Sequence, residues 1–139
     1  MRFWDSSAVI PLLVRQSASE RVDDWFAADP DIAIWTLTPV EITSALWRLV
    51  REGALVEDES RRAEQRAHDF AAASRAVIDI DAVKLLAQRL LRVHVLRAAD
   101  ALQLGAALAW SAGRPQGKTL HTLDGRLARA ARREGFDVP

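Results

Sequence analysis

Short apolar runs alternate with longer amphipathic segments along the whole chain. The short runs are rich in apolar and β-branched residues, as buried strands are, and the longer segments repeat their apolar residues at helical spacing. The predicted strands are 2–4, 32–37, 77–80, 118–123 and a short fifth strand at 136–138. The predicted helices are 8–14, one capped near 19, 38–51, 57–75, 81–91, 98–110 and 126–133. This alternation predicts an α/β fold, with a mainly parallel sheet of about five strands covered by helices on both faces.

Local sequence signals predict where two of these helices begin. Thr38, Pro39, Val40 and Glu41 have the form of a capping box with proline in the first helical position. After the third predicted strand, Asp81 is suited to cap the following helix.

The length of the chain favours one domain. A chain of 139 residues is typical of a single domain, which we expect to span 1–139, and a domain of this size buries roughly 68% of its unfolded surface. The absence of cysteine excludes disulfides, thiolate zinc sites and cysteine nucleophiles. An acid at position 5 interrupts the first apolar run too early for a signal peptide, and no uncharged apolar stretch approaches the ~18 residues of a membrane span. These features favour a cytoplasmic protein without a membrane partner.

Charge is distributed unevenly along a chain whose formal net charge is zero. Residues 1–88 contain 10 basic and 15 acidic side chains, whereas residues 89–139 contain 9 basic and 4 acidic ones. Zero net charge argues against a protein that coats nucleic acid, but a basic rim around an acidic centre suits a phosphate-backbone substrate. A solvated, arginine-rich helix face is an equally good explanation at this point.

Four acids occupy positions that such a sheet would bring together. Asp5 follows the first strand, Glu41 the second and Asp124 the fourth, while Asp100 opens the helix that precedes the fourth strand. The carboxyl ends of parallel strands meet at one edge, where open sheets bind their ligands. Four carboxylates at one point repel each other unless a cation lies among them, and their hard oxygen atoms suit Mg²⁺ or Mn²⁺. Such a site activates water and binds a phosphate ester, so the pattern predicts a metal-dependent phosphodiesterase, most simply a nuclease.

Each acid also has an ordinary structural explanation. Asp5 and Asp124 stand where helix N-caps are common, and Glu41 is the last member of the capping box. Asp100 is harder to explain in this way, because the residues on its side of the helix are apolar. A buried charge needs a cation or hydrogen-bond donors, although the amide groups of the first helical turn supply some.

Two hydroxyl residues and one histidine lie close to the acids in the sequence. Ser7 and Thr122 are each two residues from an acid, where a hydroxyl can hold a carboxylate or a metal-bound water in place. Both are equally well explained as capping or strand residues. His121 lies beside Thr122, but the three histidines lack the spacing of a metal-binding motif and are best explained as core or surface residues.

Several catalytic motifs are absent. The chain has no GxxxxGK[ST] phosphate-binding loop, no GxGxxG dinucleotide motif and no GxSxG nucleophile elbow. No second aspartate stands two residues after Asp5, which argues against an aspartyl-phosphate phosphatase.

Four segments occur in an order that resembles a known family. They are Asp5-Ser6-Ser7-Ala8, the early Glu41, the Leu-Arg-Ala-Ala-Asp-Ala-Leu-Gln-Leu run at 96–104, and Thr122-Leu123-Asp124. Together they resemble the PIN-domain ribonucleases, specifically the VapC-type toxins of bacterial toxin–antitoxin pairs. The likeness covers 2–138, essentially the whole chain. Gly105 is one mild departure, because alanine is commoner at this point of the helix.

The resemblance implies a three-layer α/β/α sandwich and an acidic pocket that binds Mg²⁺ or Mn²⁺ and cleaves RNA. On this basis Asp5 and Asp100 would be the principal metal ligands, and Glu41 and Asp124 would complete the pocket directly or through waters. The hydroxyl positions of the family match Ser7 and Thr122, while His121 has no assigned part. A metal-bound water would attack phosphorus in line and leave a 5′-phosphate and a 3′-hydroxyl. A homodimer held by a VapB-type antitoxin is also implied.

Two other functions remain open from the sequence. The chain would act as an RNA- or partner-binding module with little chemistry of its own if its basic part, and not its acids, carried the function. It would be a structure-specific or DNA-cleaving nuclease of the same superfamily if the acids carried the function but RNA were not the substrate.

Overall fold

The computed structural model describes all 139 residues. Its strands are β1 (Arg2–Trp4), β2 (Ile32–Trp35), β3 (Arg75–Val77) and β4 (Leu120–His121). Its helices are α1 (Ser6–Leu13), α2 (Ser19–Ala28), α3 (Thr38–Arg51), α4 (Glu57–Ala73), α5 (Ile80–Val93), α6 (Ala98–Trp110) and α7 (Gly125–Glu134). The predicted alternation of strands and helices is therefore confirmed.

The strands form one parallel sheet in the order β3-β2-β1-β4. Phe3 of β1 lies between Ala33 on one side and Leu120 on the other, which makes β1 a central strand. The sheet has four strands, not about five. The predicted fifth stretch forms only a single parallel bridge, between Thr119 and Asp137.

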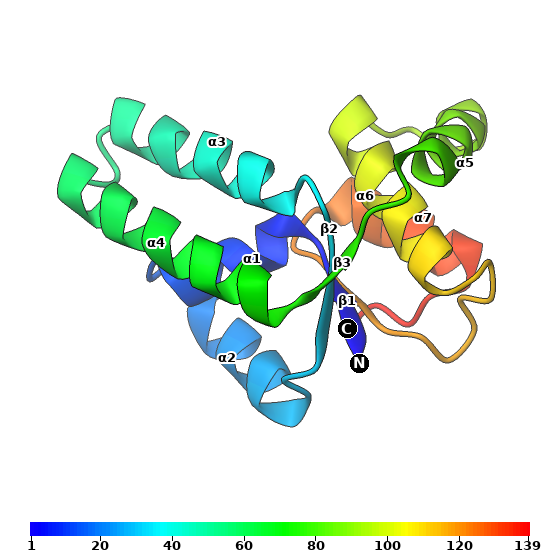
Figure 1. The fold of residues 1–139 in the computed structure, drawn as a ribbon, viewed down its shortest axis with the longest axis horizontal. Coiled ribbons are helices and arrows are strands. Elements are labelled where there is room, and N and C mark those ends of the chain that lie inside the picture. Colours follow the sequence, from blue (N-terminus) through cyan, green and yellow to red (C-terminus); the bar gives the residue numbers. More distant parts are fainter.

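Helices cover both faces of this sheet, as Figure 1 shows, with α1 to α4 on one side and α5 to α7 on the other. Side chains alternate between the faces of a strand, so Phe3 enters the core beneath α5, α6 and α7, whereas Trp4 enters the core beneath α1 to α4. Strands covered on both faces need apolar residues at successive positions, and all four residues of β2 are buried. The three-layer α/β/α arrangement is thereby confirmed.

The predicted position of the third strand was wrong. The strand begins directly after α4 and ends at Val77, whereas Ile78 and Ile80 lie outside it and are 73% and 51% exposed. The reason is the length of the pairing between β3 and β2: β3 pairs only with residues 33–35 of β2, and the chain then leaves the sheet. Consequently α5 is capped by Asp79, whose carboxylate accepts a hydrogen bond from Ala82 N at 3.0 Å, and not by Asp81.

No helix of this fold is long and apolar enough to cross a membrane.

Gly105 lies where α6 crosses α5 closely, and this explains why glycine stands in mid-helix. A Cβ at this position would lie 3.0 Å from the carbonyl oxygen of Val83 and 3.3 Å from the amide nitrogen of Ala87. Both contacts are with backbone atoms, so relief requires the two helices to move apart.

We therefore predict that Gly105→Ala lowers the free energy of unfolding by about 1–3 kcal/mol, because overpacking outweighs the gain in helix propensity of about 1 kcal/mol. Urea unfolding followed by circular dichroism measures this. Gly125→Ala in α7 is the matched control, since its added Cβ meets nothing nearer than 3.6 Å. A stability of Gly105→Ala equal to that of the control would contradict the packing explanation.

Candidate active site

The four predicted acids all stand at helix starts on the carboxyl side of the sheet. Asp5 caps α1 directly after β1, Glu41 lies in the first turn of α3 after β2, and Asp124 caps α7 after β4. Asp100 lies in the first turn of α6. In Figure 1, β1 and β2 run from the side with the two termini toward the starts of α1 and α3, which places these helix starts at one edge.

Asp5 is the most enclosed of the four acids, with 4% of its surface exposed. Its carboxylate accepts hydrogen bonds from the hydroxyl and amide groups of Ser7, from Thr122 Oγ1 at 2.9 Å and from Ser6 Oγ at 3.3 Å. Burial nevertheless raises the pKa of Asp5, because these donors offset only part of the cost of removing a carboxylate from water. Asp5 thus caps α1, but its carboxylate also binds three hydroxyl groups that capping does not require.

Ser7 and Thr122 connect the segments that follow β1 and β4 at this edge. Ser7 Oγ accepts a hydrogen bond from Leu123 N at 2.9 Å and lies 3.2 Å from Thr122 Oγ1. Thr122 Oγ1 also accepts a hydrogen bond from Asp124 N at 3.0 Å. Both hydroxyls therefore bind the Asp5 carboxylate, and Thr122 links it to the chain at Asp124.

The predicted capping box at the start of α3 is wrong. Leu37 is the N-cap residue and provides no side-chain hydrogen bond, and Thr38 is already helical. The Glu41 carboxylate instead accepts hydrogen bonds from Ser6 Oγ at 2.8 Å and from Gln103 Nε2 at 3.0 Å. Because it is not needed to cap the helix, the Glu41 side chain is directed toward the residues after β1 and the face of α6.

Ser6 and Gln103 belong to the site, although neither was predicted from the sequence. Ser6 Oγ lies within hydrogen-bonding distance of both Asp5 and Glu41. Gln103 is 1% exposed and binds Thr38 Oγ1 at 3.2 Å as well as Glu41, while its Oε1 atom has no protein partner. A buried amide three residues after Asp100, in an otherwise apolar helix, was the available signal for Gln103.

Asp100 and Asp124 both make local capping contacts. Asp100 is half-buried, not enclosed by an apolar face as expected, and it accepts a hydrogen bond from Arg97 N at 3.1 Å. Asp124 accepts hydrogen bonds from Arg126 N at 2.8 Å and Leu127 N at 2.9 Å, both through Oδ1. Both side chains therefore cap a helix, as the ordinary structural explanation predicts. The capping hydrogen bonds use one oxygen atom of each carboxylate.

The negative charges of the site act on one another. Burial raises the pKa of Glu41, and the charges of Asp5 and Asp100 raise it further, against the opposing hydrogen bonds from Gln103 and Ser6. A carboxyl pKa responds in this way to like charges that lie nearby with little water between them. The structure thus brings Asp5, Glu41 and Asp100 into one electrostatic group.

No group of three or more His, Asp or Glu side chains is arranged to hold a metal ion in this structure. As they stand, the carboxylates are satisfied by hydroxyl and amide donors. The chemistry of the donor set still fits a hard divalent cation, because the donors are carboxylate oxygens and a cation would offset both the burial and the mutual repulsion that raise the pKa of Glu41.

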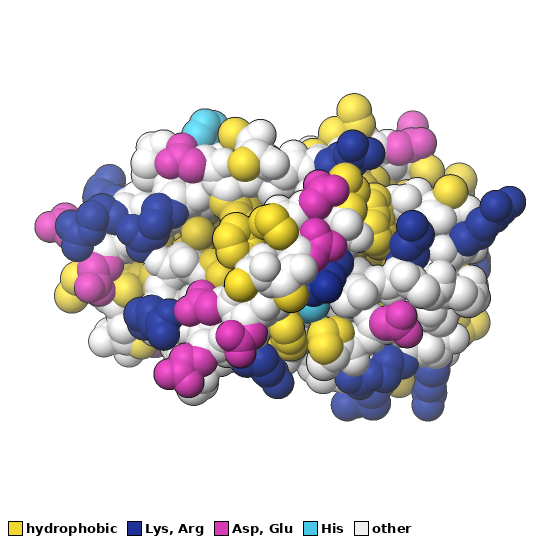
Figure 2. Space-filling view, turned by 90° about the horizontal axis from the view of Figure 1, so that it is seen from below, with side chains coloured by type: hydrophobic (Ala, Val, Ile, Leu, Met, Phe, Trp, Pro, Cys, Tyr) yellow, Lys and Arg dark blue, Asp and Glu magenta, His cyan; other side chains and the backbone are white.

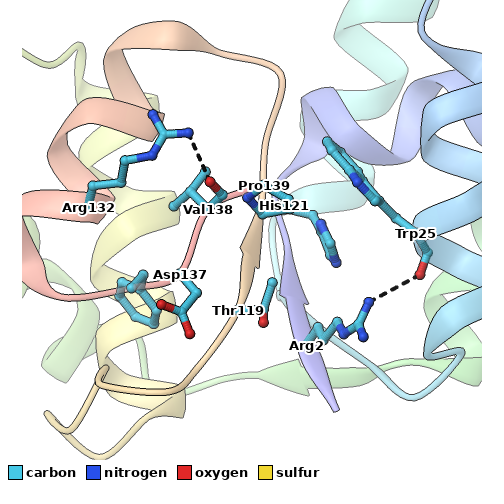
Figure 3. A pocket seen from close by; sticks show the side chains of 9 residues that line it. Arg2, Trp25, Thr119, His121, Arg132, Asp137, Val138 and Pro139 are labelled. Atoms are coloured by element: carbon cyan, nitrogen blue, oxygen red, sulfur yellow. Dashed lines mark hydrogen bonds between the residues drawn. The ribbon is translucent and has the colours of Figure 1, made fainter.

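His121 lies in a separate hollow. Its ring is 1% exposed and stacks on Trp25 at 4.6 Å, and burial lowers its pKa to about 4. The hollow has a volume of about 550 Å³ and is lined by Arg2 and Arg132 among others, as Figure 3 shows. His121 contacts none of the four acids through its side chain, so it remains unassigned to the site.

Comparison with known proteins gives two matches in sequence. No family model matches the chain. The chain is 34% identical over 137 residues to ribonuclease VapC45 of Mycobacterium tuberculosis strain CDC 1551 / Oshkosh, and equally to ribonuclease VapC49 of Mycobacterium tuberculosis strain ATCC 25618 / H37Rv. Each alignment covers 98% of this chain and 92% of the relative.

The fold also matches solved structures. A toxin–antitoxin complex from Klebsiella pneumoniae contains a chain that superposes with a TM-score of 0.67 at 16% identity, covering 92% of this chain and 91% of that one. This agreement concerns the fold, and it extends over nearly the full length of both proteins.

We predict that the raised pKa of Glu41 makes the metal-free protein lose stability as pH rises. A carboxyl group whose pKa is higher in the folded state binds its proton more tightly there, so the free energy of unfolding falls as pH rises through the folded-state pKa. Glu41→Gln should reduce this fall, whereas Asp24→Asn, which removes an exposed acid, should not. Urea unfolding in EDTA across a pH series measures it, and equal pH dependence in all three proteins would contradict the prediction.

Proposed function

The chain belongs to the VapC ribonucleases, and from this premise we propose that it is a metal-dependent endoribonuclease, the toxin of a type II toxin–antitoxin pair. The observation that supports this proposal most strongly is the placement of Asp5, Glu41 and Asp100 at helix starts on the carboxyl side of the sheet, where Ser6 Oγ hydrogen-bonds both Asp5 and Glu41. Burial raises the pKa of Asp5 and of Glu41, so placing these two carboxylates here costs the fold stability near neutral pH. Functional sites are where such shifts are most often found.

The four acids are the residues that would hold Mg²⁺ or Mn²⁺. Asp5 and Asp100 would be the principal ligands, and Glu41 and Asp124 would complete the pocket directly or through waters. When bound, the cation would lower the pKa of a water molecule and neutralise charge on the phosphodiester.

The neighbouring polar side chains would keep the ligands in place. Ser7 and Thr122 fix the orientation of the Asp5 carboxylate from two directions. Ser6 and Gln103 do the same for Glu41, and Gln103 connects α6 to the start of α3 through Thr38. Outer hydrogen bonds of this kind orient metal ligands and usually affect metal affinity when removed.

The proposed partners are an RNA substrate, a VapB-type antitoxin and a second copy of the chain. The family membership supports all three, and the match in fold to a chain of a toxin–antitoxin complex supports the antitoxin. An RNA- or partner-binding module with little activity is the competing function. Its support is the basic C-terminal part of the chain, and it predicts RNA binding that survives EDTA without any cleavage.

We predict that the purified protein cleaves single-stranded or looped RNA in Mg²⁺ or Mn²⁺, and that Asp5→Asn and Asp100→Asn each abolish cleavage while the fold is retained. Asparagine keeps the shape of the side chain and removes its charge, so the loss would report on cation binding and not on packing. Gel analysis of total bacterial RNA measures cleavage, and circular dichroism measures the fold.

Asp24→Asn is the matched control, because Asp24 is exposed on α2 and makes no hydrogen bond or ion pair. Full activity of Asp5→Asn or Asp100→Asn would overturn the assignment of the site. DNA of the same sequence distinguishes an RNA-specific enzyme from a nuclease that accepts both. Absence of cleavage by folded, partner-free protein under every metal condition would favour the binding module.

A further inference from the structure

Three arginines form a row on one side of α7. Arg126, Arg129 and Arg133 are spaced by three and four residues, the spacing that aligns side chains along one face of a helix. With a rise of 1.5 Å per residue, the row is about 10 Å long. It lines a hollow of about 340 Å³ together with His94, Val95 and Ala130, and none of the lining residues is an acid.

These three guanidinium groups have no protein partner. Two neighbouring arginines, in contrast, are engaged: Arg89 pairs with Glu134 at 2.5 Å, and Arg132 donates a hydrogen bond to the carbonyl oxygen of Val138 at 2.9 Å. His94 occupies the second oxygen of Glu134 at 2.7 Å. Glu134 is thus already neutralised, and no acid forms an ion pair with Arg126, Arg129 or Arg133.

On the face shown in Figure 2, which is the side of α2 and the two termini, basic side chains are interspersed with acids. Ion pairs reflect this mixing, since Arg2 lies 3.4 Å from Asp29 and Arg15 lies 2.8 Å from Asp23. On this face, unlike along α7, these arginines are therefore paired with acids.

The row begins at the candidate active site. Arg126 is two residues after Asp124, and its amide group binds the Asp124 carboxylate. The Nη1 atom of Arg129 lies 3.6 Å from the place where a Cβ of Gly125 would stand, so this guanidinium reaches back toward the start of the helix. Across the hollow, 94–95 lead through Arg97 into the first turn of α6, where Asp100 stands.

We propose that Arg126, Arg129 and Arg133 bind consecutive backbone phosphates of single-stranded RNA next to the bond that is cleaved. This inference rests on the proposed ribonuclease function and assigns a binding path to it. Unpaired guanidinium groups attract phosphates without reading bases, and the helix N-terminus beneath Arg126 adds to the positive potential. The row would position the strand, while the acids would act on the scissile phosphate.

The test uses Arg129→Ala/Arg133→Ala, which removes the two exposed members of the row. Its matched control is Arg51→Ala/Arg114→Ala, which removes two exposed arginines that form no ion pair. Arg51 ends α3 and Arg114 follows α6, whereas Glu41 and Asp100 lie at the opposite ends of these helices. Fluorescence anisotropy with a short unstructured RNA in EDTA, over a series of NaCl concentrations, measures binding without cleavage. Steady-state cleavage in Mg²⁺ or Mn²⁺ supplies kcat and KM.

We expect the row variant to bind RNA several-fold more weakly. Log affinity falls with log salt, and this negative slope should become shallower by about 0.7 for each phosphate that the protein no longer neutralises. KM should rise with little change in kcat, and the control should match wild type in every measurement. Arg129→Lys/Arg133→Lys keeps the charge and should retain most of the salt slope, which guards against misfolding of the alanine variant.

Unchanged affinity and salt slope in the row variant would overturn the proposal, whether or not the protein cleaves RNA. The proposal would also be overturned if the row variant lost the binding of an oligoglutamate peptide but bound RNA as wild type does. That result would identify the row as a protein-binding surface. If the salt slope falls as expected but no protein cleaves RNA with metal, the ribonuclease function fails while the phosphate-binding row stands.

Discussion

The burial of one carboxylate at the end of a central strand constrains the rest of the site. Asp5 follows β1, which pairs with both β2 and β4, and only 4% of its surface is exposed. Its charge is tolerated because hydroxyl donors converge on it from α1 and from the segment after β4. Those same hydroxyls hold Leu123 N and Asp124 N, and this contact sets where α7 begins.

The second constraint is the repulsion between neighbouring acids. Glu41 lies near the charges of Asp5 and Asp100, and Ser6 and Gln103 provide the donors that make this arrangement tolerable. The chain thus uses buried or half-buried polar side chains to hold carboxylates close together, where salt bridges to arginine would have been an easier solution. Three unpaired arginines instead lie along α7, the helix that Asp124 caps. An acidic centre with a basic rim is the arrangement expected of a site for a phosphodiester.

Much of this was predictable from the sequence, because the parallel topology follows from apolar runs alternating with amphipathic segments. Topology alone placed Asp5, Glu41 and Asp124 after the strands that bring them to one edge. The failures share a cause: they depend on contacts between residues far apart in the sequence. The pattern at Thr38 to Glu41 predicts a capping box, but Gln103, which is 62 residues beyond Glu41, binds that carboxylate instead. Ile78 and Ile80 suggest a strand, but the length of the edge pairing is decided by β2.

The central claim is that these carboxylates form one cation site, and direct measurement of Mn²⁺ binding tests it most simply. Electron paramagnetic resonance reports free Mn²⁺, so a titration of the metal-free protein gives the affinity without any RNA or cleavage. Wild type and Asp24→Asn should bind Mn²⁺ alike and gain thermal stability from it, whereas Asp5→Asn should lose both effects. Binding by Asp5→Asn equal to that of wild type, or no binding by folded wild type, would contradict the account.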